Sequence, residues 1–321
     1  MLQALFYILI FVASCFIFFI FGDLIIKNLI KVGRILGWKE FVIAFLAIAL
    51  PTTIPDLFVG IVSILKKIPE LSLGDVAGGN IVDLTLTVSL AVLFGNRELK
   101  LESRTVRQSS FFTIFSAILP LFLIYDGILS RVDGIILLLC LIFYFLWLFS
   151  EKERFEKDYQ EIEITFKEKT TFVLKNLAKI FLGIILLVFA AQGIVISAQF
   201  FSEHFKLPLI LVGILIVGLG NASPETYLSV VAARKNQGWV VLGNLMGSVV
   251  FCSTLVLGIV SLFCPIEISK ISHFEVARIF LILSSLFFFF FLSTKKKITE
   301  KEALFLLFIY ISFLIVESLL R

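Results

Sequence analysis

The chain has 321 residues, of which 60% are hydrophobic and only 16% charged, and its mean hydropathy is +1.07. A soluble domain carries about 25% charged residues, so this composition excludes a water-soluble fold. The net charge of +4 does not indicate nucleic-acid binding, because the basic residues lie in short segments between apolar stretches. We therefore expect the lipid bilayer as the partner, and no nucleic acid.

The apolar residues come in stretches of about twenty, the length of helix that crosses about 30 Å of hydrocarbon. Windows of about nineteen residues predict ten transmembrane helices. Their expected ranges are 3–26, 41–65, 74–95, 107–125, 132–149, 176–201, 208–233, 239–263, 275–293 and 302–320. The first stretch lacks a basic leader and a small-residue cleavage site, so we expect a retained membrane helix. The predicted fold class is an all-α polytopic membrane protein.

One long hydrophilic segment, 151–175, divides these helices into two sets of five. Its acidic and basic residues nearly alternate, which predicts a solvated linker between a first half, 1–150, and a second half, 176–321. Most of the 28 Lys and Arg residues lie in this linker and in the loops after odd-numbered helices. The positive-inside tendency then places the linker in the cytoplasm and both termini outside, in a multi-pass protein of the cell membrane.

Two blocks of the sequence align without a gap at an offset of 169 residues. Residues 51–56 lie over residues 220–225, and the alignment continues to the end of the following helix. The matched pairs are Pro55 and Pro224, Asp56 and Glu225, Gly74 and Gly243, Gly78 and Gly247, and Thr85 and Thr254. Because each half has an odd number of helices, the second half enters the membrane with opposite polarity. Such inverted repeats predict a transporter with its site near the midplane, at the repeat interface.

Asp56 and Glu225 follow the apolar segments 46–50 and 215–219. A carboxylate at that depth costs several kcal/mol, which indicates an ion pathway or a charged partner. The alternatives are pairing with Lys or Arg and a position at the membrane interface, but no basic residue interrupts helices two, three, seven or eight. Each acid follows a proline, which we expect to break its helix and free carbonyl oxygens. Carboxylates and carbonyls bind hard cations such as Ca²⁺, and Thr52, Thr53 and Asn221 could add oxygen atoms.

The next helix of each half carries a second group of small and polar residues, 78–83 and 247–252. Gly78, Gly79 and Gly247 fit close helix packing, and they also fit ion coordination through an exposed backbone. Asp83 lies about ten residues into its helix without a basic neighbour. We therefore expect Asp83 to belong to the ion site.

These paired blocks resemble the alpha repeats of the calcium/cation antiporter superfamily, whose sodium/calcium exchangers carry a Gly-Thr-Ser-Leu-Pro-Glu-type motif twice. The resemblance covers roughly 51–95 and 220–264. It implies that Asp56 and Glu225 are the central ion ligands. The further ligands that it implies are Thr52, Thr53, Asn221 and Ala222, the backbone carbonyls of Ala49 and Gly218, and then Gly79, Ser248, Asp83 and Cys252.

The sequence also departs from the family pattern. Pro51 replaces a glycine, and Asp56 replaces the usual glutamate with a side chain one methylene shorter. The last paired position has Asp83 and Cys252 where sodium/calcium exchangers tend to have asparagine and then aspartate. The three carboxylates could balance one Ca²⁺ with one charge left over, or up to three Na⁺. Cys252 fits either a ligand for softer metals or a small buried filler.

The resemblance implies an antiporter that exchanges Ca²⁺ for Na⁺ by alternating access, with both ions as transported substrates and no resident cofactor. A Ca²⁺/H⁺ exchanger on the same scaffold stays open, as do a passive cation channel and a non-transporting membrane scaffold. The sequence contains no nucleophile–base set, metalloprotease histidine motif or phosphate loop, so we expect no enzyme activity. We expect the chain to act as a monomer.

The orientation can be tested with single cysteines in an otherwise unreactive background. A cysteine at position Lys157 should react with a membrane-impermeant thiol reagent only from the cytoplasm, and one at Glu203 only from outside. Reaction of both from the same face would contradict the inverted orientation of the two halves.

Overall fold

The computed structural model describes residues 2–35, 40–95, 98–100, 104–150, 166–268, 272–295 and 297–319. The first half contains α1 (Leu2–Ile35), α2 (Glu40–Lys66), α3 (Pro69–Val82), the π-helical turn η1 (Asp83–Thr87), α4 (Val88–Phe94), α5 (Arg104–Leu123), the 3-10 turn η2 (Ile124–Asp126) and α6 (Arg131–Ser150). The second half contains α7 (Phe166–Phe205), α8 (Leu209–Val212), the π-helical turn η3 (Gly213–Val217), α9 (Gly218–Asn221), α10 (Ser223–Arg234), α11 (Gly238–Phe251), the π-helical turn η4 (Cys252–Val256), α12 (Leu257–Phe263), α13 (Ser272–Lys295) and α14 (Glu300–Leu319).

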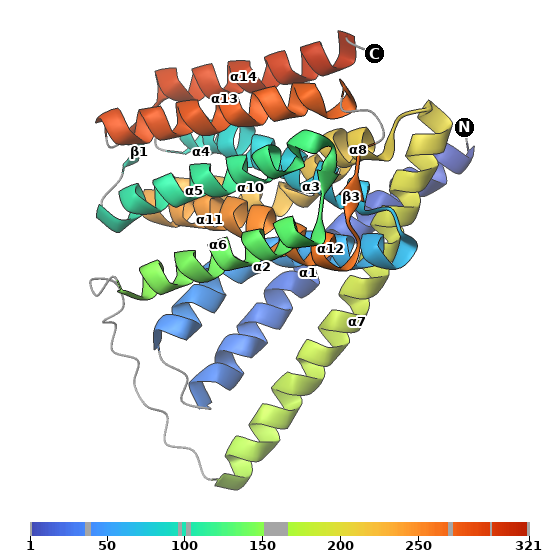
Figure 1. The fold of residues 1–321 in the computed structure, drawn as a ribbon. Helices are drawn as coiled ribbons and strands as arrows, with labels where there is room; N and C mark the ends of the chain where they lie inside the picture. Colours follow the sequence, from blue (N-terminus) through green and yellow to red (C-terminus); the bar gives the residue numbers. More distant parts are fainter. Residues whose placement is uncertain are drawn as a thin grey trace.

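Every predicted transmembrane segment coincides with a helix or with a run of joined helices. In the described part of the chain, nine of these are long and apolar enough to cross a bilayer, and the 27-residue α2 is the tenth. The fold is thus an all-α membrane protein of two inverted five-helix repeats. The start of α1 and the end of α14 lie toward the same end of the bundle, as ten crossings require (Figure 1). Helix α7 begins at Phe166, so the last ten residues of the predicted linker are helical.

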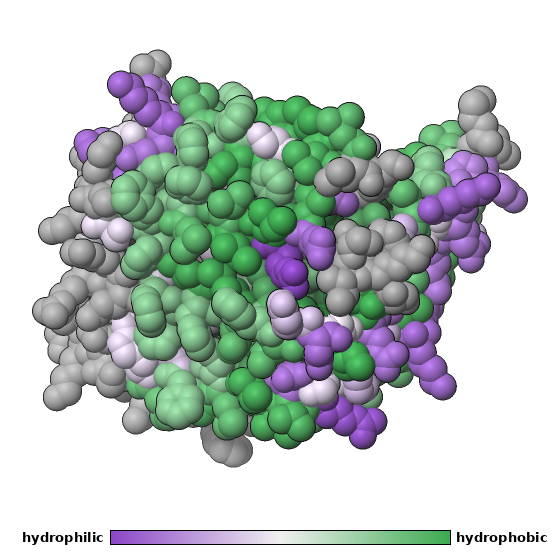
Figure 2. All heavy atoms as spheres, turned by 45° about the horizontal axis from the view of Figure 1, so that its top comes forward, coloured by the Kyte–Doolittle hydropathy of each residue, from purple (hydrophilic) through white to green (hydrophobic). Residues whose placement is uncertain are grey.

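The helices differ strongly in how much of their surface the protein itself covers. Along the most apolar part of the span Val240–Phe263, 83% of the residues are buried, and along Pro69–Phe94 the share is 78%. The corresponding share is 11% in the first span, Gln3–Gly22. The third and eighth spans therefore form the centre of the bundle. Figure 2 shows a broad hydrophobic surface on one face, as expected where lipid covers the helices, with one small hydrophilic group near its middle and others toward its edges.

The buried apolar side chains form two main groups around this centre. The larger group joins the third and eighth spans to α5, α13 and α14 and includes Leu84, Val249 and Phe288. The smaller group joins α1, α2 and α7 and includes Val59 and Leu187. Figure 1 shows α13 and α14 side by side along one side of the bundle, with α1 and α7 on the other.

The inverted symmetry extends to the irregular parts of the helices. The π-helical turns η1 and η4 begin at Asp83 and Cys252, which are 169 residues apart. Thr85 and Thr254 in these turns each donate a hydroxyl hydrogen bond to the carbonyl four residues earlier, that of Ile81 and that of Val250. A hydroxyl that takes such a carbonyl competes with the helical amide, which favours a local rearrangement of the helix. Both π-helical turns therefore lie at the same depth as the predicted ion ligands.

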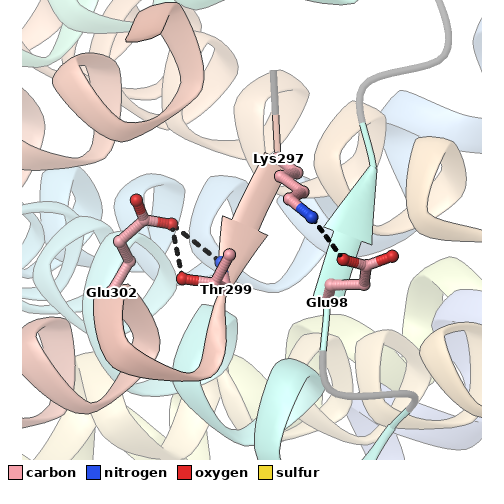
Figure 3. Close-up of polar contacts among 4 residues, drawn as sticks. All are labelled: Glu98, Lys297, Thr299 and Glu302. Atoms are coloured by element: carbon pink, nitrogen blue, oxygen red, sulfur yellow. Dashed lines mark hydrogen bonds and ion pairs between the residues drawn. The ribbon is translucent and has the colours of Figure 1, made fainter. Parts of the chain in front are cut away.

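Short strand pairs connect the two repeats outside the helices. Strand β1 (Glu98–Lys100) pairs antiparallel with β4 (Lys297–Thr299), and β2 (Ile128–Leu129) pairs with β3 (Ile266–Glu267). Each pair joins a loop of the first repeat to a loop of the second. In Figure 3 the Nζ atom of Lys297 lies 2.9 Å from Oε2 of Glu98 across the first pair.

The start of α14, directly after the strand β4, has one of the two hydrogen bonds of a capping box. Oε2 of Glu302 accepts hydrogen bonds from the backbone N–H of Thr299 at 2.8 Å and from its hydroxyl at 3.0 Å (Figure 3). Glu302 lies three residues after Thr299, which is the spacing of this motif. The pairing of β1 with β4 and these hydrogen bonds together fix where the last helix begins.

The two prolines have different effects in the two repeats. In the second repeat the span is broken as expected: α9 ends at Asn221, and α10 begins at Ser223 with Pro224 in its first turn. In the first repeat the predicted break is wrong, because α2 continues as one helix through Pro51 and Pro55. A proline removes only one backbone hydrogen bond, and neighbouring helices can accommodate the freed carbonyl in a membrane protein.

Glycines allow α3 to cross the α8–η3–α9 segment with the two backbones in direct contact. A Cβ atom at Gly74 would overlap the carbonyl oxygen of Ile210, and one at Gly78 would overlap that of Ile214. From the other side, a Cβ atom at Gly213 would lie 2.6 Å from the carbonyl oxygen of Leu71. Gly78 therefore serves close packing, one of the two functions left open by its sequence.

This contact predicts a difference between two matched glycines. Gly74→Ala should destabilise the protein by roughly 1–3 kcal/mol, because the new methyl group meets a backbone carbonyl that cannot rotate away. The control is Gly243→Ala at the equivalent position of the second repeat, where a Cβ atom meets nothing within 4 Å. Thermal unfolding of the two purified variants in detergent measures the difference. Equal losses in both would show that the glycine contact does not determine stability.

Candidate functional site

A small buried cavity lies where the third and eighth spans meet the centres of α2 and the seventh span. The cavity has a volume of about 10 Å³, which is room for about one water molecule. Residues of both repeats line it: Asp56, Asp75, Val76, Gly79, Asn80, Asp83, Asn221, Ala222, Glu225, Ser248 and Cys252. The cavity therefore lies at the repeat interface, where transporters of this architecture bind their substrates.

Four carboxylates face this cavity, and all four are buried. The exposed fractions are 8% for Asp56, 0% for Asp75, 2% for Asp83 and 3% for Glu225. None of the described residues that line the cavity is Lys, Arg or His. Carboxylates buried together repel each other and are costly to keep ionised, so the arrangement favours a bound cation.

Hydrogen bonds divide the polar groups into two flanks. On one flank, Nδ2 of Asn221 lies 3.1 Å from Oδ1 of Asp56 and 3.1 and 3.0 Å from the two carboxylate oxygens of Asp75. On the other flank, the Ser248 hydroxyl donates to Oε1 of Glu225 at 2.9 Å, and Asp83 faces the Glu225 carboxyl group. We call these the Asp75 flank (Asp56, Asp75 and Asn221) and the Asp83 flank (Asp83, Glu225 and Ser248).

Each flank contains a buried oxygen atom that makes no hydrogen bond within the described part of the chain. Oδ1 of Asn221 and Oδ1 of Asp83 have no hydrogen-bond partner in the described part of the chain. Both residues line the cavity. An unsatisfied buried oxygen costs about 1–3 kcal/mol, which a cation or an ordered water at this position would offset.

The break in the seventh span places Glu225 in an electrostatically favourable position. Because α10 begins at Ser223, Glu225 lies in the first turn of that helix. The unpaired backbone N–H groups at a helix start carry partial positive charge and stabilise a nearby carboxylate. The same break brings Asn221, at the end of α9, beside the cavity.

Most of the residues expected at the ion site line the cavity. These are Asp56, Asp83, Asn221, Glu225 and Ser248, together with Gly79, Ala222 and Cys252. A Cβ atom at Gly79 would have only the Gly218 carbonyl oxygen near it, at 3.9 Å, so this position leaves open space beside the cavity. The Cys252 thiol lies 3.3 Å from Oδ2 of Asp56 and can donate to it.

The remaining expected ligands do not line the cavity in this structure. Thr53 is buried in α2 outside the lining. The carbonyl of Gly218 accepts the backbone N–H of Ala222 at 3.0 Å, which still leaves it a second lone pair. Ala49 and Thr52 lie on α2, but their side chains fall outside the described residues. The site assignment as a whole stays a prediction.

Asp75 and Asn80 were missed by the sequence analysis. Asp75 is the second residue of the predicted span 74–95, close to the expected membrane interface, whereas Asp83 lies about ten residues into that span. The 169-residue offset pairs Asp75 with Asn244, so the repeat alignment marked a polar position but not the charge. Asn80 donates to the Ser253 hydroxyl at 2.8 Å and so links the repeats beside the cavity.

The four carboxylates come from three spans and do not form a compact metal site by themselves. Among the described residues, no three His, Cys, Asp or Glu side chains are grouped closely enough to hold a metal ion alone. A cation here would also need amide, hydroxyl, carbonyl or water oxygens, which suits a hard ion such as Ca²⁺ or Na⁺.

An inverted-repeat membrane fold with a buried polar site at the repeat interface defines a secondary transporter. The family model described as "Sodium/calcium exchanger protein" matches residues 6–150 and 175–319. The chain therefore belongs to this family, and cation exchange is the activity that membership supports.

Curated relatives agree with this family. The sodium/calcium exchanger MaX1 of Methanosarcina acetivorans is 28% identical over 92% of this chain and 93% of its own length. The inner membrane protein YrbG of Escherichia coli is 24% identical over 78% of each chain. The similarity to MaX1 thus covers nearly the whole of both proteins.

Solved structures agree with the fold. The sodium-calcium exchanger NCX_Mj soaked with Na⁺ and Sr²⁺ superposes with a TM-score of 0.64 at 21% identity, covering 96% of this chain and 97% of that chain. The same exchanger soaked without Na⁺ and Ca²⁺ superposes with a TM-score of 0.62 at 21% identity, covering 100% of this chain and 99% of that chain. At this identity the match concerns the fold.

The Asp83 flank allows a test of whether its acid must come from the first repeat or can come from the second. Asp83→Asn should lower Na⁺-driven Ca²⁺ uptake at least about tenfold, because the equivalent residue of the second repeat, Cys252, brings no charge to replace it. The double variant Asp83→Asn with Cys252→Asp returns one acid to the same depth and should recover most of the uptake. Sodium dependence should suffer more than Ca²⁺ binding. Normal exchange by Asp83→Asn at every sodium concentration would make Asp83 a structural carboxylate.

Proposed function

We propose that this protein exchanges Ca²⁺ for Na⁺ across the cell membrane by alternating access. The observation that carries the proposal is the meeting of carboxylates from both repeats in one buried cavity without a basic residue among its described lining. Three of these carboxylates, Asp56, Asp83 and Glu225, exceed the charge of one Ca²⁺ by one, so the same groups can also hold several Na⁺. The family of the chain and the name of its relative MaX1 support these two ions.

The proposed ligands form one competitive site. Asp56 and Glu225 would bind Ca²⁺ from opposite repeats, with Asp83, Asn221 and Ser248 beside them. Thr52, Thr53 and the carbonyls of Ala49 and Gly218 would complete the shell in states of the cycle other than this one. Because Ca²⁺ and Na⁺ need the same oxygens, binding of one ion displaces the other, which is the condition for antiport.

The inverted repeats suggest how access alternates. Residues 1–150 and 176–321 would be the two repeat units, and 151–175 would connect them on the cytoplasmic side, with both termini outside. Relative movement of the repeats would then open the cavity first to one side and then to the other.

Uptake of ⁴⁵Ca²⁺ into proteoliposomes tests the proposal. An outward Na⁺ gradient should drive uptake by the wild type, and Asp56→Asn and Glu225→Gln should each abolish it, because each removes a site charge. Both substitutions also relieve the burial of a charge, so membrane insertion should persist. Glu317→Gln, which changes a buried acid outside the cavity lining, is the matched control and should exchange Ca²⁺.

Three outcomes would contradict the proposal. Uptake driven by a pH gradient but not by Na⁺ would indicate proton exchange, and uptake without any opposing gradient would indicate a passive channel. Ca²⁺ uptake at the wild-type rate by Asp56→Asn or Glu225→Gln would show that these acids do not form the ion site.

A further inference from the structure

Asp75 is a fourth buried carboxylate that the family resemblance did not include in the ion site. It lies on α3, its side chain is fully buried, and it lines the cavity. Its carboxyl group faces that of Asp56, which interacts with it electrostatically. The equivalent residue of the second repeat is the neutral Asn244, so the extra charge belongs to the first repeat alone.

The amide of Asn221 occupies the position between these two acids. Its nitrogen lies 3.0 to 3.1 Å from three carboxylate oxygens, one of Asp56 and two of Asp75. An amide nitrogen has only two hydrogens, so it cannot make three full hydrogen bonds. The Asn221 amide therefore cannot satisfy all the oxygens around it, and the two carboxyl groups also hydrogen-bond each other.

The oxygen of the same amide points to a ligand. Asn221 is 5% exposed, and its Oδ1 atom has no hydrogen-bond partner among the described residues. Rotation of the amide would bring this oxygen toward the two acids, and a cation between them could then bind all three groups. Such a cation would satisfy the unpaired oxygen and neutralise the facing carboxylates at once.

We propose that Asp75, together with Asp56 and Asn221, forms a binding subsite for one monovalent cation, and that this subsite shares Asp56 and Asn221 with the adjacent position at which Ca²⁺ binds. A monovalent ion fits because Asp75 adds a single negative charge to the three carboxylates already assigned to exchange. In the proposed function this ion is Na⁺, so the inference rests on that function. Asp75 then raises the number of Na⁺ ions bound by one.

Equilibrium binding of ²²Na⁺ to the purified protein in detergent tests the inference without transport. Asp75→Asn keeps the side-chain shape and copies the residue of the second repeat. At saturating Na⁺ it should bind one ion fewer per chain than the wild type and should still bind ⁴⁵Ca²⁺. Asp75→Glu keeps the charge and should restore the count, while Glu317→Gln should bind as many ions as the wild type. If Asp75→Asn is not monodisperse, Asp75→Ser serves in its place.

The outcomes separate this inference from the proposed function. An unchanged Na⁺ count and affinity in a folded Asp75→Asn or Asp75→Ser variant would overturn the subsite, even if the wild type exchanges Na⁺ for Ca²⁺. A wild type that binds Na⁺ with the predicted loss in Asp75→Asn, but that shows no Na⁺-driven Ca²⁺ uptake, would overturn only the proposed function. A wild type that binds no Na⁺ would overturn both.

Discussion

The close contact between α3 and the α8–η3–α9 segment determines where the groups of the cavity lie. Gly74, Gly78 and Gly213 let the two backbones touch, and no larger residue fits without displacing one of them. This contact brings Asp75 and Asp83, on either side of Gly79, within reach of Asn221 and Glu225 from the other repeat. In a membrane, where helix association gains little from the hydrophobic effect, such packing of small residues is a main source of stability.

The same contact creates an electrostatic cost that a bound cation would offset. Four buried carboxylates share a cavity with room for about one water molecule, where they hydrogen-bond amide, hydroxyl and thiol groups and, within each flank, each other. These hydrogen bonds leave oxygen atoms of Asn221 and Asp83 unpaired. A cation at this site would satisfy these oxygens and neutralise part of the charge. A transporter must also release its ion, and an ion that binds too tightly is not released.

Much of this arrangement could be predicted from the sequence, because periodic apolar stretches and a constant repeat offset are strong signals. The ten spans, the inverted repeats and the importance of Asp56 and Glu225 could be predicted from the sequence without a structure. Three features depended on tertiary context: the continuity of α2 through Pro55, the π-helical turns at Asp83 and Cys252, and the entry of Asp75 into the cavity. Which face of α3 meets the other repeat is decided by the glycine contact, and the alignment alone could not show that Asp75 lies on that face.

The central claim is that Ca²⁺ and Na⁺ compete for one set of carboxylates contributed by both repeats. Equilibrium ⁴⁵Ca²⁺ binding to the purified wild-type protein, titrated with Na⁺, tests it most directly. The account predicts one Ca²⁺ per chain, displaced by Na⁺ with a Hill coefficient above one because several Na⁺ replace each Ca²⁺. Calcium that stays bound at saturating Na⁺ would contradict the account, because the two ions would then occupy independent sites.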